Sequence, residues 1–119
     1  MFSILAVDDD QDIVDLLAIL LEGAGHRVHG FTSSRDALDF ARLHRIDAAI
    51  LDVNMPPPDG IELAQLLQAD PRTCLVRIAF HTSWPEDIVR AAFEGTALHL
   101  MKPASGDTIV AGVERLMHA

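Results

Sequence analysis

The chain has 119 residues, half of them hydrophobic, and a net charge of −9. This length fits one domain whose core needs no disulfide or structural metal, and a single cysteine, Cys74, excludes an internal disulfide. The nine lysines and arginines form no cluster along the sequence, which argues against direct nucleic-acid binding because phosphate contacts need concentrated positive charge. No apolar run approaches the roughly 18 residues that a membrane span needs. We therefore expect a cytoplasmic domain without a membrane segment.

Short apolar runs alternate with stretches that read as helices along the whole chain. Runs of strand length occupy residues 2–7, 28–31, 47–52, 75–80 and 97–101. Each is followed by a predicted helix, at 13–21, 37–43, 60–69, 85–94 and 109–117. Strict alternation predicts an α/β fold, in which a parallel sheet carries helices on both faces and the connections are right-handed crossovers.

Turn and capping residues mark the ends of several predicted helices. Gly23 and Gly25 are expected to end the first helix, and Pro85 suits the first turn of the fourth. Ser105 or Asp107 can cap the fifth.

Polar side chains follow four of the five predicted strands. Asp52 stands at the end of the third strand, directly before a proline-rich turn. The carboxyl ends of parallel strands share one edge of a sheet, so these side chains are expected to gather there. The alternative is that each residue only caps a turn or hydrates a loop. That account fits any one of them but not the whole set, which is Asp8, Asp9, Asp52, Thr82 and Lys102.

The residue types at this edge indicate phosphoryl chemistry. Clustered carboxylates repel one another unless a cation joins them, and hard oxygen ligands suit Mg²⁺. A carboxylate such as Asp52 beside that metal is a nucleophile for a phosphoryl group. Lys102 can neutralise the transferring group while the Thr82 hydroxyl donates to it. Nothing obvious serves as a strong general base for turnover of small substrates.

Four motifs make the chain resemble the receiver domain of two-component response regulators, and the resemblance covers essentially its whole length. The motifs are residues 7–10, 51–60, 81–83 and 101–103. The resemblance implies a flavodoxin-like (βα)5 fold with a doubly wound, parallel five-stranded sheet in the strand order 2-1-3-4-5. It also implies that residues 1–119 form one receiver domain.

The same resemblance implies a phosphoacceptor and a metal site. Asp52 matches the residue that accepts a phosphoryl group from a histidine kinase or a phosphotransfer protein. Asp8 and Asp9 match the acidic pair that binds Mg²⁺ together with Asp52, and Asn54 matches the residue that lends its backbone carbonyl to the metal. Thr82 matches the switch hydroxyl, and Lys102 the lysine of the phosphate pocket.

The implied activity is self-catalysed phosphorylation and dephosphorylation, and no separate metabolite is turned over. The expected partners are the kinase or phosphotransfer protein and a downstream effector protein or output domain, with neither nucleic acid nor membrane. The domain is expected to be a monomer or a phosphorylation-dependent dimer.

His99 and Trp84 depart from the family pattern, and Cys74 lies outside the family's motifs. His99 stands where the family usually has Tyr or Phe as a rotating switch aromatic, so we hypothesise that the switch is altered or pH-sensitive, the alternative being a packed or surface histidine. Trp84 is expected to be a partly buried aromatic at a helix start, and a bolder hypothesis is that it keeps water from the phosphoryl group. Cys74 is expected to be a buried small hydrophobe.

Other function classes are weaker but open. A small Mg²⁺-dependent phosphohydrolase could use Asp52, although the haloacid-dehalogenase type wants a second acid two residues on, where Asn54 stands. A flavodoxin-like cofactor binder is disfavoured because Asp8 and Asp9 would repel phosphate. A receiver-like binding module that is never phosphorylated is disfavoured because every site residue is present.

Overall fold

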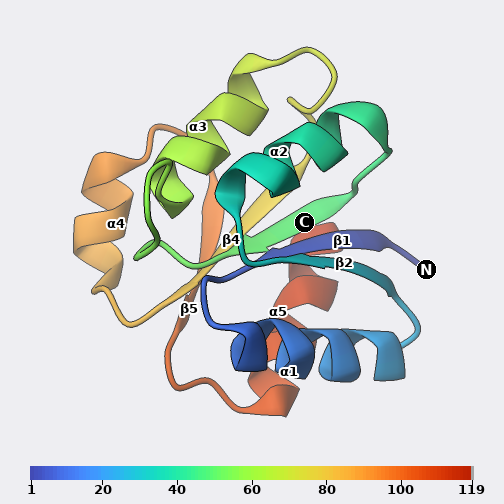
Figure 1. The fold of residues 1–119 in the computed structure, drawn as a ribbon. Helices are drawn as coiled ribbons and strands as arrows, with labels where there is room; N and C mark the ends of the chain where they lie inside the picture. Colours follow the sequence, from blue (N-terminus) through green and yellow to red (C-terminus); the bar gives the residue numbers. More distant parts are fainter. Residues whose placement is uncertain (119) are drawn as a thin grey trace.

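Five parallel strands alternate with five helices in the structure, a computed structural model that describes residues 1–118 (Figure 1). The strands pair in the order β2-β1-β3-β4-β5, which confirms the flavodoxin-like arrangement. The strands are β1 (Ser3–Val7), β2 (Arg27–Phe31), β3 (Ala48–Leu51), β4 (Arg77–Thr82) and β5 (Ala97–Met101). The helices are α1 (Gln11–Gly23), α2 (Ser34–Leu43), α3 (Gly60–Ala69), α4 (Glu86–Ala92) and α5 (Gly106–Met117).

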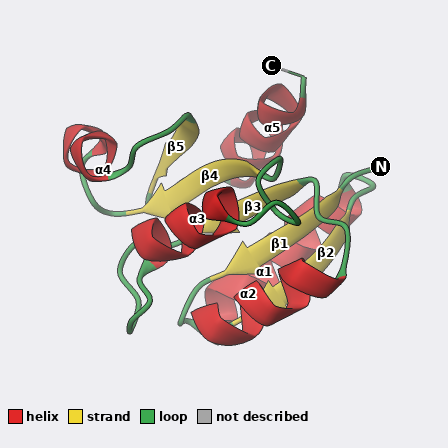
Figure 2. Cartoon of the chain, turned by 90° about the horizontal axis from the view of Figure 1, so that it is seen from above, coloured by secondary structure: helices red, strands yellow, loops and turns green. Residues whose placement is uncertain are grey.

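Helices cover both faces of the sheet. Figures 1 and 2 show α1 and α5 on one face and α2, α3 and α4 on the other. Each face has its own core, and in the core under α2 to α4 the ring of Phe80 packs edge-on against Phe93 with centroids 5.1 Å apart. The core under α1 and α5 includes Leu17 and Ile109. All four residues of β3 are buried, as expected of a central strand covered on both sides.

Four of the five helices begin at a side chain that caps a backbone N–H. The caps are Asp10, Ser33, Asp59 and Ser105, and Asp59 also forms a reciprocal capping box with Glu62. Helix α4 is the exception, because Pro85 at its N-cap has no side-chain hydrogen bond to offer. These caps hold the ends of the loops that follow the strands. The polar residues predicted to gather at the carboxyl ends of the strands lie beside these loops.

The fourth strand lies two residues further along the chain than the predicted range 75–80. Residues 71–75 form a turn, in which the Thr73 hydroxyl donates to the carbonyl of Leu67 and Leu75 is left 90% exposed. At its other end β4 reaches Thr82, because β5 continues beside it and pairs Thr82 with Met101. The Thr82 hydroxyl therefore belongs to the strand and not to the loop after it.

The expectation that Cys74 is buried is wrong. Cys74 lies in the turn before β4 and is exposed, with its thiol 3.6 Å from the carbonyl of Pro71. An apolar side chain in an exposed turn has no core to enter. None of the helices within residues 1–118 combines the length and hydrophobicity that a bilayer crossing requires.

Candidate functional site

Strand register brings the aspartates of the first and third strands together. Val7 pairs with Leu51, so the residues that follow them, Asp8 and Asp52, emerge side by side at the carboxyl edge. The backbone N–H of Asp52 donates to the carbonyl of Val7 at 3.0 Å, which holds this alignment one step beyond the strands. Both carboxylates are buried, at 1% exposure for Asp8 and 7% for Asp52.

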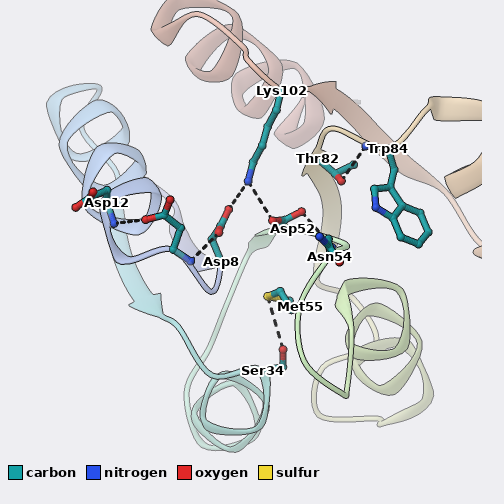
Figure 3. A network of polar contacts seen from close by, with 10 residues as sticks. Asp8, Asp12, Ser34, Asp52, Asn54, Met55, Thr82, Trp84 and Lys102 are labelled. Carbon is teal, nitrogen blue, oxygen red and sulfur yellow. Dashed lines mark hydrogen bonds and ion pairs between the residues drawn. The ribbon is translucent and has the colours of Figure 1, made fainter.

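Lys102 reaches this pair from the end of β5. Its ammonium donates to Asp8 Oδ2 at 2.7 Å and to Asp52 Oδ2 at 3.0 Å (Figure 3). Strands β3 and β4 lie between β5 and β1 in the sheet, so only a long side chain can bridge this distance. The backbone N–H of Lys102 donates to the carbonyl of Thr82, which anchors the lysine's start at the end of β4.

Burial and hydrogen bonding have opposite effects on the pKa values of Asp8 and Lys102. Burial raises the pKa of the Asp8 carboxyl, and the hydrogen bond from Lys102 opposes that rise. Burial also works to lower the pKa of Lys102, but its hydrogen bonds to Asp8 and Asp52 outweigh this effect and leave the pKa raised. Lys102 therefore stays protonated at neutral pH and balances only part of the carboxylate charge.

The chemistry of the donor set fits a hard divalent cation. Asp8, Asp9 and Asp52 each offer a carboxylate oxygen, and these oxygens lie within 4.8 Å of one another. Two of the three side chains are buried, so their negative charge is poorly hydrated without a cation. Few oxygen ligands with an open side toward solvent are typical of Mg²⁺, which keeps several waters.

Backbone groups orient the two buried carboxylates. Asp8 Oδ1 accepts the N–H of Asp10 at 3.0 Å, and Asp52 Oδ1 accepts the N–H of Asn54 at 3.2 Å. Gly60 lies against the same segment, where a Cβ atom would meet the carbonyl oxygen of Asp52 at 2.0 Å. Only glycine permits this approach, so the residue helps to place the carboxylate.

Thr82 and His99 are connected through the main chain of Trp84. The Thr82 side chain is fully buried, and its Oγ1 accepts the N–H of Trp84 at 3.2 Å. His99 Nε2 lies 3.0 Å from the carbonyl oxygen of the same residue. Within residues 1–118 the Thr82 hydroxyl makes no hydrogen bond to Asp52, so the structure brings Thr82 to the edge but engages it with Trp84. Residue types alone could not reveal a link that runs through a backbone.

His81 is a buried titratable group that sequence reasoning did not single out. It is 4% exposed, and its Nδ1 has no hydrogen-bond partner in the described part of the chain. Burial lowers the pKa of His81 to about 4, the charge of Lys102 adds to this, and Asp52 opposes it. The imidazole is therefore neutral at pH 7. Its place in a strand that is buried on both faces accounts for its burial.

Comparisons with known proteins agree with this architecture. The sequence model of the family described as Response regulator receiver domain matches residues 4–114. The Heme response regulator HssR of Staphylococcus epidermidis is 33% identical over 103 residues, which cover 87% of this chain and 46% of that protein. The DNA-binding response regulator MtrA of Mycobacterium tuberculosis is 32% identical over 110 residues, which cover 92% of this chain and 48% of that protein.

Solved structures show the same likeness. The chemotaxis protein CheY4 of Vibrio cholerae superposes with a TM-score of 0.88 at 28% identity, over 98% of each chain. The chain spans about half the length of the curated relatives it matches, and nearly the full length of this structural neighbour.

Proposed function

The chain belongs to the response regulator receiver domain family of two-component signalling, and on that premise we propose that it is a switch phosphorylated on Asp52. Phosphorylation of an aspartate is the general mechanism of this family. The observation that carries the proposal is the contact of Lys102 with both Asp8 and Asp52 at the carboxyl edge. A buried carboxylate held beside an ammonium and further carboxylates suits attack on a phosphoryl group.

We propose Mg²⁺ as the cofactor. Asp8, Asp9 and Asp52 would hold it with their carboxylates, and Asn54 with its backbone carbonyl. When bound, the ion would neutralise charge on the phosphoryl oxygens.

The proposed reaction is a transfer between the donor and Asp52. A carboxylate oxygen of Asp52 attacks phosphorus, the bond from phosphorus to the donor breaks, and the donor atom keeps that electron pair. Asp52 becomes an acyl phosphate. Lys102 gives up its 3.0 Å contact with Asp52 and pairs its ammonium with a phosphoryl oxygen.

The switch runs from Thr82 to His99 in this proposal. In the unphosphorylated protein, Thr82 Oγ1 accepts the N–H of Trp84. Once the Thr82 hydroxyl donates to the phosphoryl group, the Thr82 side chain shifts relative to this N–H. The carbonyl of Trp84 is hydrogen-bonded to His99, so a shift of the Trp84 main chain also moves His99 on β5. The phosphorylated and unphosphorylated domains then present different surfaces around Trp84.

The proposed setting follows from the family and the composition. Residues 1–119 act as one receiver domain in the cytoplasm. A chain with one cysteine forms no internal disulfide and so needs no oxidising compartment. A histidine kinase or phosphotransfer protein supplies the phosphoryl group, and an effector protein or output domain reads it. This domain itself contacts neither nucleic acid nor membrane, turns over no metabolite, and is a monomer or a phosphorylation-dependent dimer.

Phosphate release separates this switch from a hydrolase. The protein is incubated with Mg²⁺ and excess acetyl phosphate, and free phosphate is followed beside the fraction of protein that carries an adduct. We expect a stable adduct fraction with slow release. Rapid multiple-turnover release with almost no adduct would identify a phosphohydrolase instead.

A further inference from the structure

A basic groove lies at the amino-terminal ends of strands β3 and β4, opposite the edge that carries Asp8 and Asp52. It has a volume of about 560 Å³ and is formed by the end of α2, the loop from α2 to β3, the turn before β4, the start of β4 and the end of α5. Asp47 is the acidic residue in its lining. Four of the chain's nine lysines and arginines line it, although the net charge is −9: Arg42, Arg45, Arg72 and Arg77. Positive charge is thus concentrated on one edge of an acidic protein, which the sequence order conceals.

Asp70 holds two of these arginines in place. It accepts from Arg72 Nε at 3.1 Å and from Arg72 Nη2 at 2.7 Å, and its Oδ2 lies 3.2 Å from Arg42 Nε. The hydrogen bond from Arg72 keeps the pKa of Asp70 well below its usual range, so the carboxylate remains charged. A guanidinium has five N–H donors. Arg72 therefore keeps donors for a further carboxylate while its side chain is already oriented.

Arg45 is the most available cation of the groove. Its side chain is 92% exposed and its nearest carboxylate, Asp47, is 3.8 Å away. The guanidinium of Arg77, by contrast, donates to the carbonyls of Leu116 and Met117 at the end of α5 and helps to form the wall of the groove.

Exposed leucines border the arginines. Leu43 is 78% exposed and Leu75 is 90% exposed, and both line the groove. Leu66, at 40% exposure, lines an adjoining hollow of about 500 Å³ that shares Arg42 and Arg72 with the groove. Arginine is enriched and lysine depleted at protein-binding surfaces, and the exposed leucines add apolar area that a partner can cover.

We propose that this basic groove docks an acidic peptide segment of a partner protein, one that also carries an aliphatic side chain. Carboxylates of the segment pair with Arg45 and Arg72, and its aliphatic side chain packs on Leu43 and Leu75.

Charge favours a short segment over an extended polyanion. Exposed charges interact over a Debye length of about 8 Å at physiological ionic strength. A peptide in the groove therefore meets four arginines against the carboxylates of Asp47 and Asp70, whereas an anionic membrane or a nucleic acid also faces the acidic remainder of the chain.

The groove and the phosphorylation edge are at opposite ends of the strands. Asp47 precedes β3 and Asp52 follows it, so the length of a strand, about 15 Å, separates them. The groove therefore shares no residue with the site around Asp52, and a docked segment leaves that edge open to a kinase.

The test uses a fluorescein-labelled peptide of 14 residues, made of glutamate and aspartate with two leucines. Fluorescence anisotropy with the wild-type protein is expected to show saturable binding that weakens as salt rises. A double variant, Arg45→Ala with Leu75→Ser, should bind at least tenfold more weakly. Its matched control is Arg90→Ala with Ile19→Ser, which replaces an exposed arginine of α4 and a 70% exposed isoleucine of α1 and should bind like the wild type. Circular dichroism establishes that each variant is folded.

Two further measurements complete the test. Amide shifts on peptide addition should concentrate in residues 41–47 and 69–77, and Asp52→Asn should retain the peptide affinity, which separates this inference from the phosphorylation proposal. The inference is overturned by no saturable binding, by equal loss in the double variant and its control, or by binding to vesicles with 30% phosphatidylglycerol in place of the peptide.

Discussion

The Nε2–H of His99 donates to the main-chain carbonyl of Trp84 at 3.0 Å and ties β5 to the loop that follows β4. A carbonyl can only accept, so the bond itself assigns the proton to Nε2. Trp84 also donates its N–H to Thr82, and its backbone is therefore held between the two proposed switch residues.

This link predicts a defect in His99→Phe, which keeps an aromatic ring but cannot donate. Trp84 is the only tryptophan, so its fluorescence reports on the loop directly. We expect the fluorescence change on acetyl phosphate addition to shrink at least twofold in His99→Phe and to be kept in His99→Gln, which retains a donor. An unchanged response in His99→Phe would remove His99 from the switch.

The same geometry bears on pH. Both the neutral Nε2–H tautomer and the imidazolium can donate to the Trp84 carbonyl. We therefore expect the wild-type fluorescence response to persist from pH 6 to pH 8, in keeping with an altered switch rather than a pH-sensitive one. A response that disappears on one side of this range would favour the pH-sensitive switch.

His81 predicts acid sensitivity of the fold. Its pKa is about 4 in the folded protein and its ordinary value is 6.5, so the unfolded chain binds a proton first as the pH falls. Stability is then lost between pH 6.5 and pH 4, by about 2 kcal/mol at pH 5. The raised pKa of Asp8 acts in the opposite direction, because its protonation on acidification favours the folded state.

The comparison that isolates His81 is therefore wild type against His81→Leu. Urea unfolding at pH 7 and pH 5, in EDTA, should show a smaller loss of stability on acidification in the variant. Equal losses in the two proteins would contradict the assignment.

Gly60 predicts a strong steric effect next to the phosphoacceptor. In Gly60→Ala the new methyl group meets the Asp52 carbonyl, and Asp52 or the start of α3 must move. We expect a destabilisation of about 1–3 kcal/mol, as for other overpacked sites. Gly23→Ala is the control, since nothing lies within 4 Å of its added methyl group, and its thermal stability should not fall and should rise slightly because alanine favours the helix.

Lys102 predicts opposite effects on metal binding and phosphorylation. Its ammonium bonds to Asp8 and Asp52, two of the carboxylates proposed to hold the metal. Lys102→Met should therefore bind Mg²⁺ several-fold more tightly in a calorimetric titration, while the yield of phosphorylated protein falls at least tenfold. Weaker Mg²⁺ binding in Lys102→Met would show that the lysine supports the metal site rather than competing with it.

The fold was predictable because alternation and strand order leave few choices. Once residues 2–7 and 47–52 are read as neighbouring parallel strands, Asp8 and Asp52 must come together. The boundaries of β4 were less accessible, because the apolar Leu75 and Val76 look like strand residues. The hydrogen bonds of the turn around Thr73 decide where the strand begins.

Two tertiary features could not be predicted, the bond from His99 to the Trp84 main chain and the basic groove. The bond from His99 runs to a backbone carbonyl, which has no residue type to read. The four arginines of the groove come from α2, from the loop after it, from the turn before β4 and from β4, and only the folded chain gathers them. The positions of the arginines along the sequence show no basic cluster, but the folded chain brings four of them together.

The most direct test of the phosphorylation switch is intact-mass spectrometry after incubation with Mg²⁺ and acetyl phosphate. Asp52→Asn is the test variant, and Asp36→Asn, at an exposed position in the first turn of α2, is the matched control. We predict one phosphoryl adduct that depends on Mg²⁺ in the wild type and in Asp36→Asn, and none in Asp52→Asn. An adduct that persists in Asp52→Asn, or none in the wild type, would contradict the assignment of Asp52 as phosphoacceptor.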